Sequence, residues 1–181
     1  MNAVINDGAT YCYATSECDS NNSSYVGYMY TLGEQYGYIT SSYVKQQVDN
    51  WYTSSGLSNF SSSINENAIY CNDRNVGSGS WSATGSTFYY SPFSRLNSNK
   101  TPTLDCANSE DKFSKGTSGG GNGYLSYPIA LLTADELSYA GGLINGNAYN
   151  YIAYGIDSSI YAAASSWWTM SPSHWSSSGG R

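Results

Sequence analysis

The chain reads Leu132-Thr133-Ala134-Asp135-Glu136-Leu137-Ser138-Tyr139-Ala140-Gly141-Gly142 in its C-terminal half, and this stretch carries the signals of a helix start and stop. Thr133 and Glu136 have the spacing of a capping box, in which each side chain accepts a hydrogen bond from the backbone N–H of the other residue. Leu132 precedes the cap and Leu137 follows it in the first turn, the arrangement of a hydrophobic staple. These signals predict that a helix begins at Thr133.

The sequence also contains signals that predict where this helix ends. Asp135 and Glu136 fall in the first turn, where the helix dipole favours negative charge, and this role explains both carboxylates without acid–base catalysis. Gly141-Gly142 supplies the left-handed stop that ends many helices. We therefore predict a short helix over residues 133–140, entered from a strand at 129–132.

Three motifs resemble one protein group. The helix stretch resembles the leucine-(proline)-threonine-x-x-glutamate-x-x-tyrosine-alanine-x-glycine motif of the formylglycine-generating-enzyme branch of the C-type-lectin-like fold. Trp167-Trp168-Thr169-Met170-Ser171-Pro172 is similar to the strand that follows a variable loop in related bacterial surface proteins. Cys71-Asn72-Asp73-Arg74 and Asp105-Cys106 resemble the same group, which includes uncharacterised gut-bacterial domains and variable proteins of diversity-generating retroelements.

The resemblance covers roughly residues 67–172 and implies an α+β, C-type-lectin-like domain with two short helices, small antiparallel sheets and long polar loops. Copper chemistry of that branch uses a C-terminal cysteine pair, and this chain has no cysteine after Cys106. The calcium motifs of C-type lectins are also missing, and Asn150 with Asp157 makes a weak oxygen-ligand pair. We expect no cofactor, no metal site and no catalytic residue.

The rest of the chain fits one domain, 1–181, in which residues 1–66 form N-terminal strands and a helix and 67–181 form the lectin-like core with ligand-facing loops. We predict strands at 26–30 and 67–71, and two long polar loops at 77–90 and 115–123. A helix is predicted over 41–54, ending at Gly56, with an inward face of Val44, Val48 and Trp51 and an outward face of Lys45, Gln46 and Asp49.

Composition indicates an ordered binding protein. Charged residues are only 11% of the chain, whereas 19 tyrosines and five tryptophans offer large amphipathic contact area. The net charge of −6 argues against a nucleic-acid partner, which needs a basic stripe. No apolar run is long enough for a transmembrane segment. Met1 leads directly into a polar stretch, so we expect that an export signal was removed from this sequence.

The four cysteines favour an extracellular or cell-surface location. An even count suggests two disulfides, Cys12–Cys18 and Cys71–Cys106, among three possible pairings. A metal site is disfavoured because the chain has no Cys-x-x-Cys pair and one histidine. Free thiols in a cytosolic protein are the remaining alternative.

Residues that could carry catalysis are few. His174 is the only histidine and lies in a Ser-rich stretch without a glycine elbow around a serine, so a nucleophile–histidine pair is disfavoured. Asp73 and Arg74 are predicted to form an ion pair with each other near the disulfide. No sequence signal selects a carboxylate pair for glycoside hydrolysis.

The stretch 145–175 mixes aromatic residues with Asn, Ser and Gly, which is typical of antibody-like binding loops. In the resembling family the corresponding region carries the variable ligand-facing residues. Strand alternation would send one of Trp167 and Trp168 into the core, as well as Met170. The predicted ligand contacts are Tyr149, Tyr151, Tyr154, Tyr161, Trp168, His174 and Trp175.

Three functions follow as hypotheses. The first is a non-enzymatic extracellular binding domain that presents its Tyr/Trp-rich loops to a protein or carbohydrate ligand. The second is a structural subunit that self-associates into a filament or surface layer through an open sheet edge, because the closing strands of the resembling proteins are missing after Pro172. The third is an exported hydrolase.

Overall fold

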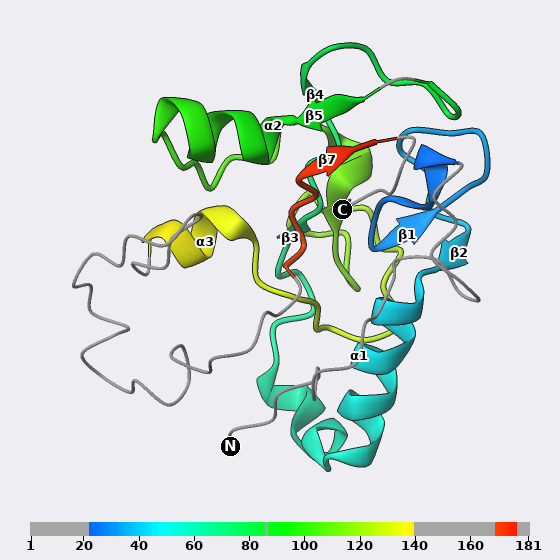
Figure 1. Ribbon diagram of the computed structural model, residues 1–181. Coiled ribbons are helices and arrows are strands. Elements are labelled where there is room, and N and C mark those ends of the chain that lie inside the picture. Colours follow the sequence, from blue (N-terminus) through cyan, green and yellow to red (C-terminus); the bar gives the residue numbers. More distant parts are fainter. Residues whose placement is uncertain (1–21, 86, 140–168, 177–181) are drawn as a thin grey trace.

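The computed structural model describes residues 22–85, 87–139 and 169–176 (Figure 1). Its strands form three small antiparallel sheets. The first pairs β1 (Met29–Tyr30) with β2 (Thr40–Ser41), and the second pairs β3 (Tyr70–Cys71) with β6 (Lys112–Phe113). The third has the order β4-β5-β7, from β4 (Val76–Ser78), β5 (Phe88–Tyr90) and β7 (His174–Trp175).

Helices of several kinds connect these strands. The α-helices are α1 (Tyr43–Ser54), α2 (Ser91–Phe93) and α3 (Ala134–Tyr139). A π-helical turn, Ser94–Asn99, continues α2, and 3-10 turns occur at Ser23–Tyr25, Leu57–Ser63 and Ser109–Asp111. The mixture of short helices and small antiparallel sheets confirms the predicted α+β class at this level.

Helix α1 confirms the predicted N-terminal helix and its end. The Ser42 side chain caps it by accepting a hydrogen bond from the Lys45 backbone N–H at 3.1 Å. Free N–H groups in a first turn require such an acceptor, which explains why the helix begins at Tyr43 rather than at residue 41. Gly56 follows the helix in the left-handed region, with φ of 78°.

The inward face of α1 differs from the prediction at two positions. Val44 and Val48 are buried as expected, but Tyr52 is buried in place of Trp51, which is half-buried. Eight residues cover slightly more than two helical turns, so Tyr52 stays close to the line of the two valines. Lys45, predicted to face outward, is 1% exposed and pairs with Asp49 at 2.5 Å.

Two clusters of apolar side chains form the core. The first joins α1 to β1, β6 and the segment after β6: Tyr28, Met29, Val44, Val48, Phe113, Leu125 and Met170. The second lies on the three-stranded sheet and contains Val26, Phe88, Tyr90 and Trp175. Met170, from the segment before β7, is fully buried in the first cluster.

Trp175 belongs to the second cluster, which corrects its prediction as a ligand contact. Its side chain is 1% exposed, and its indole nitrogen donates to the Gly85 carbonyl at 3.4 Å. Neighbouring strand residues point to opposite faces, so β7 turns Trp175 inward and leaves His174 half-buried on the other face. β7 pairs with β5 and lies at an edge of its sheet.

Three other sequence predictions change in the structure. The predicted polar loop 77–90 instead contains strands β4 and β5, which pair so that Val76 lies opposite Tyr90. The predicted strand 129–132 is irregular, and the backbone bond from Met170 N–H to the Leu132 carbonyl, 2.8 Å, does not extend into a ladder. The predicted strands 26–30 and 67–71 shorten to β1 and β3.

The loop 115–123 is free of helix and strand, as predicted, yet it packs closely. A Cβ at Gly121 would lie 2.1 Å from the Ser114 hydroxyl oxygen, and one at Gly116 would lie 2.4 Å from an Asn67 oxygen. These glycines allow the loop to lie against the second sheet, where larger residues would clash. The loop is therefore part of the packed structure.

The capping box of α3 is confirmed. The Thr133 N–H donates to the Glu136 carboxylate at 2.7 Å, and the Glu136 N–H donates to the Thr133 hydroxyl at 3.0 Å. The predicted staple buries little area, because Leu132 is 48% exposed. The stop at Gly141-Gly142 lies outside the described residues.

Arg74 is the most connected buried side chain described. Its guanidinium Nε pairs with Asp111 at 2.7 Å, and its Nη1 donates to the carbonyls of Met29 and Gly37 at 2.9 and 2.8 Å. The group is fully buried, and its carbon lies 5.7 Å from the centre of the Phe113 ring. One cation from the segment between β3 and β4 therefore joins β1, the loop that contains Gly37 and the turn that contains Asp111.

Replacing Asp111 by Asn should lower the free energy of unfolding by about 3–5 kcal/mol, because the buried Arg74 cation would lose its counter-charge. Urea denaturation measures this. The matched control is Glu66→Gln, which removes an exposed ion pair with Lys115 and should cost no more than about 1 kcal/mol. Equal losses in the two variants would contradict the central role of Arg74.

Replacing Thr133 by Ala should cost about 1 kcal/mol, because the Glu136 N–H would lose its side-chain acceptor. Thermal unfolding followed by circular dichroism measures the loss. Leu132→Ala serves as the control, since its side chain is largely exposed. A Thr133→Ala protein that melts like the parent would show that the cap contributes nothing.

Candidate ligand-binding pocket

The predicted disulfide between Cys71 and Cys106 is confirmed. Its sulfur atoms are 2.02 Å apart and its Cα atoms 5.7 Å apart, and it joins β3 to the segment that precedes β6. With a sequence separation of 35 between the cysteines, the bridge stabilises the fold by about 3–4 kcal/mol in the chain-entropy model. Cys12 and Cys18 lie outside the described residues.

A pocket of about 580 Å³ lies beside this disulfide. Its wall includes both cysteines and the apolar side chains of Ile69 and Leu104. Its charged lining residues are Asp73, Arg95, Asp105, Lys112, Asp135 and Glu136. The pocket therefore combines four carboxylates, two cations and a small apolar area, which suits a polar ligand with an apolar part.

Arg95 clamps two carboxylates in the pocket wall. Its Nε and Nη2 donate to the two oxygens of Asp135 at 2.7 and 2.6 Å, and its Nη1 donates to Asp73 at 2.6 Å. Because the guanidinium is planar, it bridges both carboxylates in one fixed geometry. This clamp connects the turn after α2 to β3 and α3.

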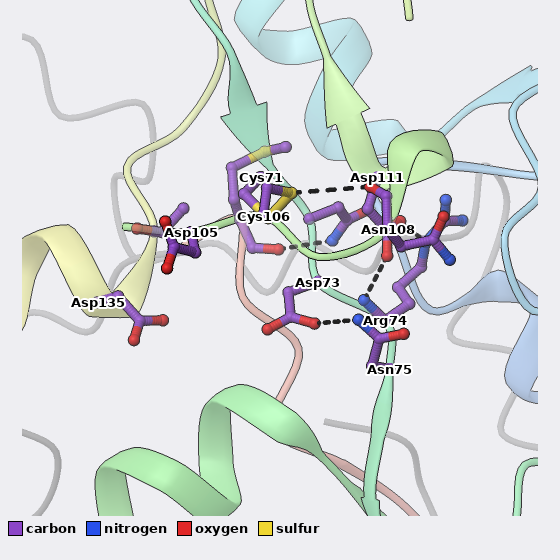
Figure 2. Close-up of a disulfide and its surroundings, with 12 residues drawn as sticks. Cys71, Asp73, Arg74, Asn75, Asp105, Cys106, Asn108, Asp111 and Asp135 are labelled. Atoms are coloured by element: carbon purple, nitrogen blue, oxygen red, sulfur yellow. Dashed lines mark hydrogen bonds and ion pairs between the residues drawn. A yellow bond between two sulfur atoms is a disulfide. The ribbon is translucent and has the colours of Figure 1, made fainter. Parts of the chain in front are cut away.

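The predicted ion pair between Asp73 and Arg74 is wrong. Asp73 pairs with Arg95, and Arg74 pairs with Asp111. Asp73 has a φ of 41°, in the left-handed region that Asp tolerates better than most residues. Figure 2 shows the result: Asp105 and Asp135 lie on one side of Asp73, and Arg74 with Asp111 lies on the other.

Burial affects the two ion-pair systems differently. For Arg95, burial alone would lower the pKa, but hydrogen bonds and charges from Asp135 and Asp73 raise the pKa above its usual value. Burial raises the pKa of Asp111, and the charge and hydrogen bonds of Arg74 oppose that rise. The Arg95 guanidinium thus stays charged across the accessible pH range.

Two charged groups of the pocket remain available for a ligand. Among the contacts within the described residues, the carboxylate of Asp105 and the ammonium of Lys112 have no ion pair and no side-chain hydrogen bond. Both carboxylate oxygens of Asp135 are engaged by Arg95, and Asp73 binds Arg95 and Asn75. A ligand would therefore meet Asp105 and Lys112 without breaking an existing pair.

The predicted aromatic contacts are only partly placed. Tyr149, Tyr151, Tyr154, Tyr161 and Trp168 lie outside the described residues, as do Asn150, Asp157 and Trp167. His174 is described, on β7, where its ring lies 5.7 Å from Tyr89 and 6.4 Å from Phe93. His174 does not line the pocket, so the structure does not bring it to the same site.

The residues that flank the Tyr-rich segment 140–168 do lie near the pocket. On one side, the Tyr139 hydroxyl donates to the Pro102 carbonyl at 2.8 Å, next to the lining residue Thr103. On the other side, Ser171 lines the pocket and its hydroxyl accepts from the Ala134 N–H at 3.0 Å. The described residues on both sides of the segment therefore border one site.

Sequence reasoning missed Arg95, Lys112 and Asp105 as site residues and assigned Asp135 to the helix alone. The small number of positively charged residues was the available signal. The chain has only seven Lys and Arg residues, so each of them is a candidate partner for a carboxylate. Scarcity could not show which carboxylates Arg95 joins, since Asp73 and Asp135 are distant in sequence.

No group of three or more His, Cys, Asp or Glu suited to a metal ion occurs in the described part of the chain. Among those same residues, no helix has the length and apolar character that crossing a membrane requires. Comparison with protein-family models, curated proteins and solved structures finds no match. The function of the pocket therefore has to be argued from its own geometry.

Replacing Arg95 by Lys should lower the free energy of unfolding by about 1.5–3 kcal/mol, because an ammonium cannot hold both carboxylates in the planar geometry. Urea denaturation with intact disulfides measures the loss. Lys112→Arg is the control, since Lys112 has no ion pair among the described residues. Equal stability of Arg95→Lys and the parent would show that the clamp does not hold the wall.

Proposed function

We propose that this protein is a non-enzymatic extracellular binding domain, and that the pocket beside Cys71–Cys106 is the centre of its ligand site. The observation that carries this proposal is that the described residues on both sides of the Tyr-rich segment 140–168 border the pocket. A ligand held in the pocket would thus lie next to the region whose composition is typical of binding loops. The ligand is a protein or a glycan.

The structural contacts of Asp135 and Glu136 support a binding role rather than a catalytic one for these two carboxylates. A general acid or base has to exchange a proton with its substrate, so its carboxyl oxygens need access to the reacting atoms. Asp135 gives both oxygens to Arg95, and Glu136 accepts two hydrogen bonds from Thr133. These carboxylates hold the wall of the pocket, and the only histidine lies on β7.

Exposed apolar side chains beside the charged lining support an interface. Leu104 lines the pocket and is 69% exposed. Ile69, the residue before β3, also lines the pocket and is 37% exposed. Tyr139, next to the pocket at Pro102, is 55% exposed. Energetically important contacts in protein interfaces come from such aromatic and apolar groups surrounded by polar ones.

The disulfide supports the extracellular part of the proposal. Disulfides persist in oxidising compartments and are rare in the cytosol. The Cys71–Cys106 bridge lies in the wall of the pocket itself. The same bond that suits secretion therefore also fixes Asp105 and Leu104, the residues next to Cys106 that a ligand would touch. The proposal that the core is C-type-lectin-like rests on the sequence motifs alone.

The test is a glycan array and a peptide array probed with the labelled, oxidised protein and its variants. Replacing Leu104 and Lys112 by Ala together should weaken capture about tenfold or more, as expected when interface anchors are lost. Tyr151→Ala combined with Tyr154→Ala should weaken capture of the same array members. The Leu104/Lys112 change should leave the thermal midpoint unchanged, because neither of these two side chains belongs to the buried core.

Phe60→Ala is the matched control, because Phe60 is 62% exposed on the turn after α1 and does not line the pocket. It should bind like the parent. Capture that survives in the Leu104/Lys112 variant but disappears in Phe60→Ala would place the ligand elsewhere. Loss of array members through chemical turnover would support the hydrolase alternative.

A further inference from the structure

Tyr38 and Tyr124 form a stacked pair on the surface. Their ring centres are 3.9 Å apart and their planes differ by 9°. The side chains come from segments that are distant in sequence, and the residues are 37% and 36% exposed. The pair therefore lies outside the core and open to reagents in solvent.

The backbone holds both tyrosines in place. The N–H groups of Tyr38 and Ile39 donate to the Thr31 hydroxyl at 3.2 and 3.3 Å. The carbonyl of Gly37 accepts from the buried Arg74 at 2.8 Å, which fixes the same loop from below. Tyr38 is therefore positioned by the interior of the protein.

The Tyr124 side of the pair is fixed as well. Its N–H donates to the Asn122 side chain at 3.1 Å, and the next residue, Leu125, is buried and pairs with the Ser114 carbonyl at 3.0 Å. Gly123 supplies the left-handed turn, with φ of 75°, that brings Tyr124 out of the loop. The two rings thus meet because two anchored loops meet.

The hydroxyl groups of the pair also interact. A hydrogen bond with the Tyr38 side chain raises the pKa of Tyr124, as expected for a hydroxyl that donates its proton. With the ring centres 3.9 Å apart and the planes nearly parallel, the carbon atoms of one ring lie close to those of the other.

We propose that Tyr38 and Tyr124 are a site of oxidative cross-linking, at which the two rings join as dityrosine within one chain. Each phenol loses one electron and its hydroxyl proton, and the two phenoxyl radicals form one carbon–carbon bond between their ortho positions. The ortho hydrogens then leave as protons while the hydroxyls are restored. The oxidant is a peroxide used by a peroxidase: one peroxide takes up the two electrons and two protons and leaves as two waters.

Other tyrosine pairs of the described residues are less suited to this reaction. Tyr25 and Tyr30 meet at 65° with ring centres 5.0 Å apart, and Tyr30 is buried. Tyr52 and Tyr127 have the same separation, and Tyr52, a residue of α1, is buried. Radical coupling at Tyr38 and Tyr124 is favoured because both rings are exposed and already adjacent.

A cross-link here would act as a second covalent brace. It would tie the loop after β1, which Arg74 holds at the Gly37 carbonyl, to the loop after β6, which is held by backbone bonds to Lys112 and Ser114. The Cys71–Cys106 bridge closes a different loop on the other side of β6. Oxidising surroundings that keep that disulfide would thus also be compatible with the tyrosine brace.

The test treats the dilute, disulfide-intact protein with a heme peroxidase and limiting hydrogen peroxide. Dityrosine fluorescence, gel filtration and peptide mapping by mass spectrometry follow the product. The parent should give a monomer that has lost two hydrogen atoms and carries a cross-link between the peptides of Tyr38 and Tyr124. Tyr38→Phe and Tyr124→Phe should each reduce monomer fluorescence about tenfold, because the remaining tyrosine lacks its adjacent partner.

Tyr139→Phe is the control, because Tyr139 is more exposed than either ring of the pair and should leave the product unchanged. Phe preserves ring stacking, and circular dichroism of each variant checks that it is folded. Cross-links that map to other tyrosines, that join two chains, or that form equally fast in Tyr38→Phe would overturn the proposal.

Discussion

The buried ion pair of Arg74 and Asp111 is the constraint on which the rest of the structure depends. Several strands have only two residues, so backbone ladders alone could not hold the sheets together. Arg74 replaces missing ladder bonds by donating to the carbonyls of Met29 and Gly37 while its charge is balanced by Asp111. Space for its side chain comes from a close backbone approach at Gly27, where a Cβ would lie 3.0 Å from Arg74. A cation at this depth is costly unless its charge is balanced, which makes the pairing with Asp111 specific.

The left-handed turn at Asp73 separates this interior pair from the pocket. Because Asp73 turns away from Arg74, it can meet Arg95, and Arg95 in turn holds Asp135 at the start of α3. Consecutive residues thus serve two tasks, with Arg74 holding the core and Asp73 holding the pocket wall. The disulfide at Cys71 begins the same short segment and fixes the opposite wall through Cys106. The segment 71–74 is therefore where stability and the proposed binding site are joined.

Local signals in the sequence were sufficient for local structure. The spacing of Val44 and Val48, the stop at Gly56 and the capping box at Thr133 and Glu136 all act within a few residues, and the structure confirms helices at both places. The strands β4 and β5 were missed because Ser and Gly dominate their surroundings and the burial of Phe88 and Tyr90 depends on Trp175, far along the chain. The partners of Arg74 and Arg95 were missed for the same reason. Ion pairs between distant residues leave no periodic pattern in a single sequence, whereas the Cys71–Cys106 pairing could be inferred because four cysteines allow few alternatives.

The residues that line the pocket fall into two groups, those that form ion pairs and those that do not. Residues that hold the wall, such as Arg95 and Asp135, cannot change without loss of stability, because each leaves a buried charge unpaired. Three other lining residues form no ion pair with the described part of the chain: Leu104, Asp105 and Lys112. Leu104 and Asp105 are also exposed. In the proposed binding site, ligand specificity can therefore change at these three positions while the ion pairs that support the fold stay the same, a separation that suits a scaffold for binding.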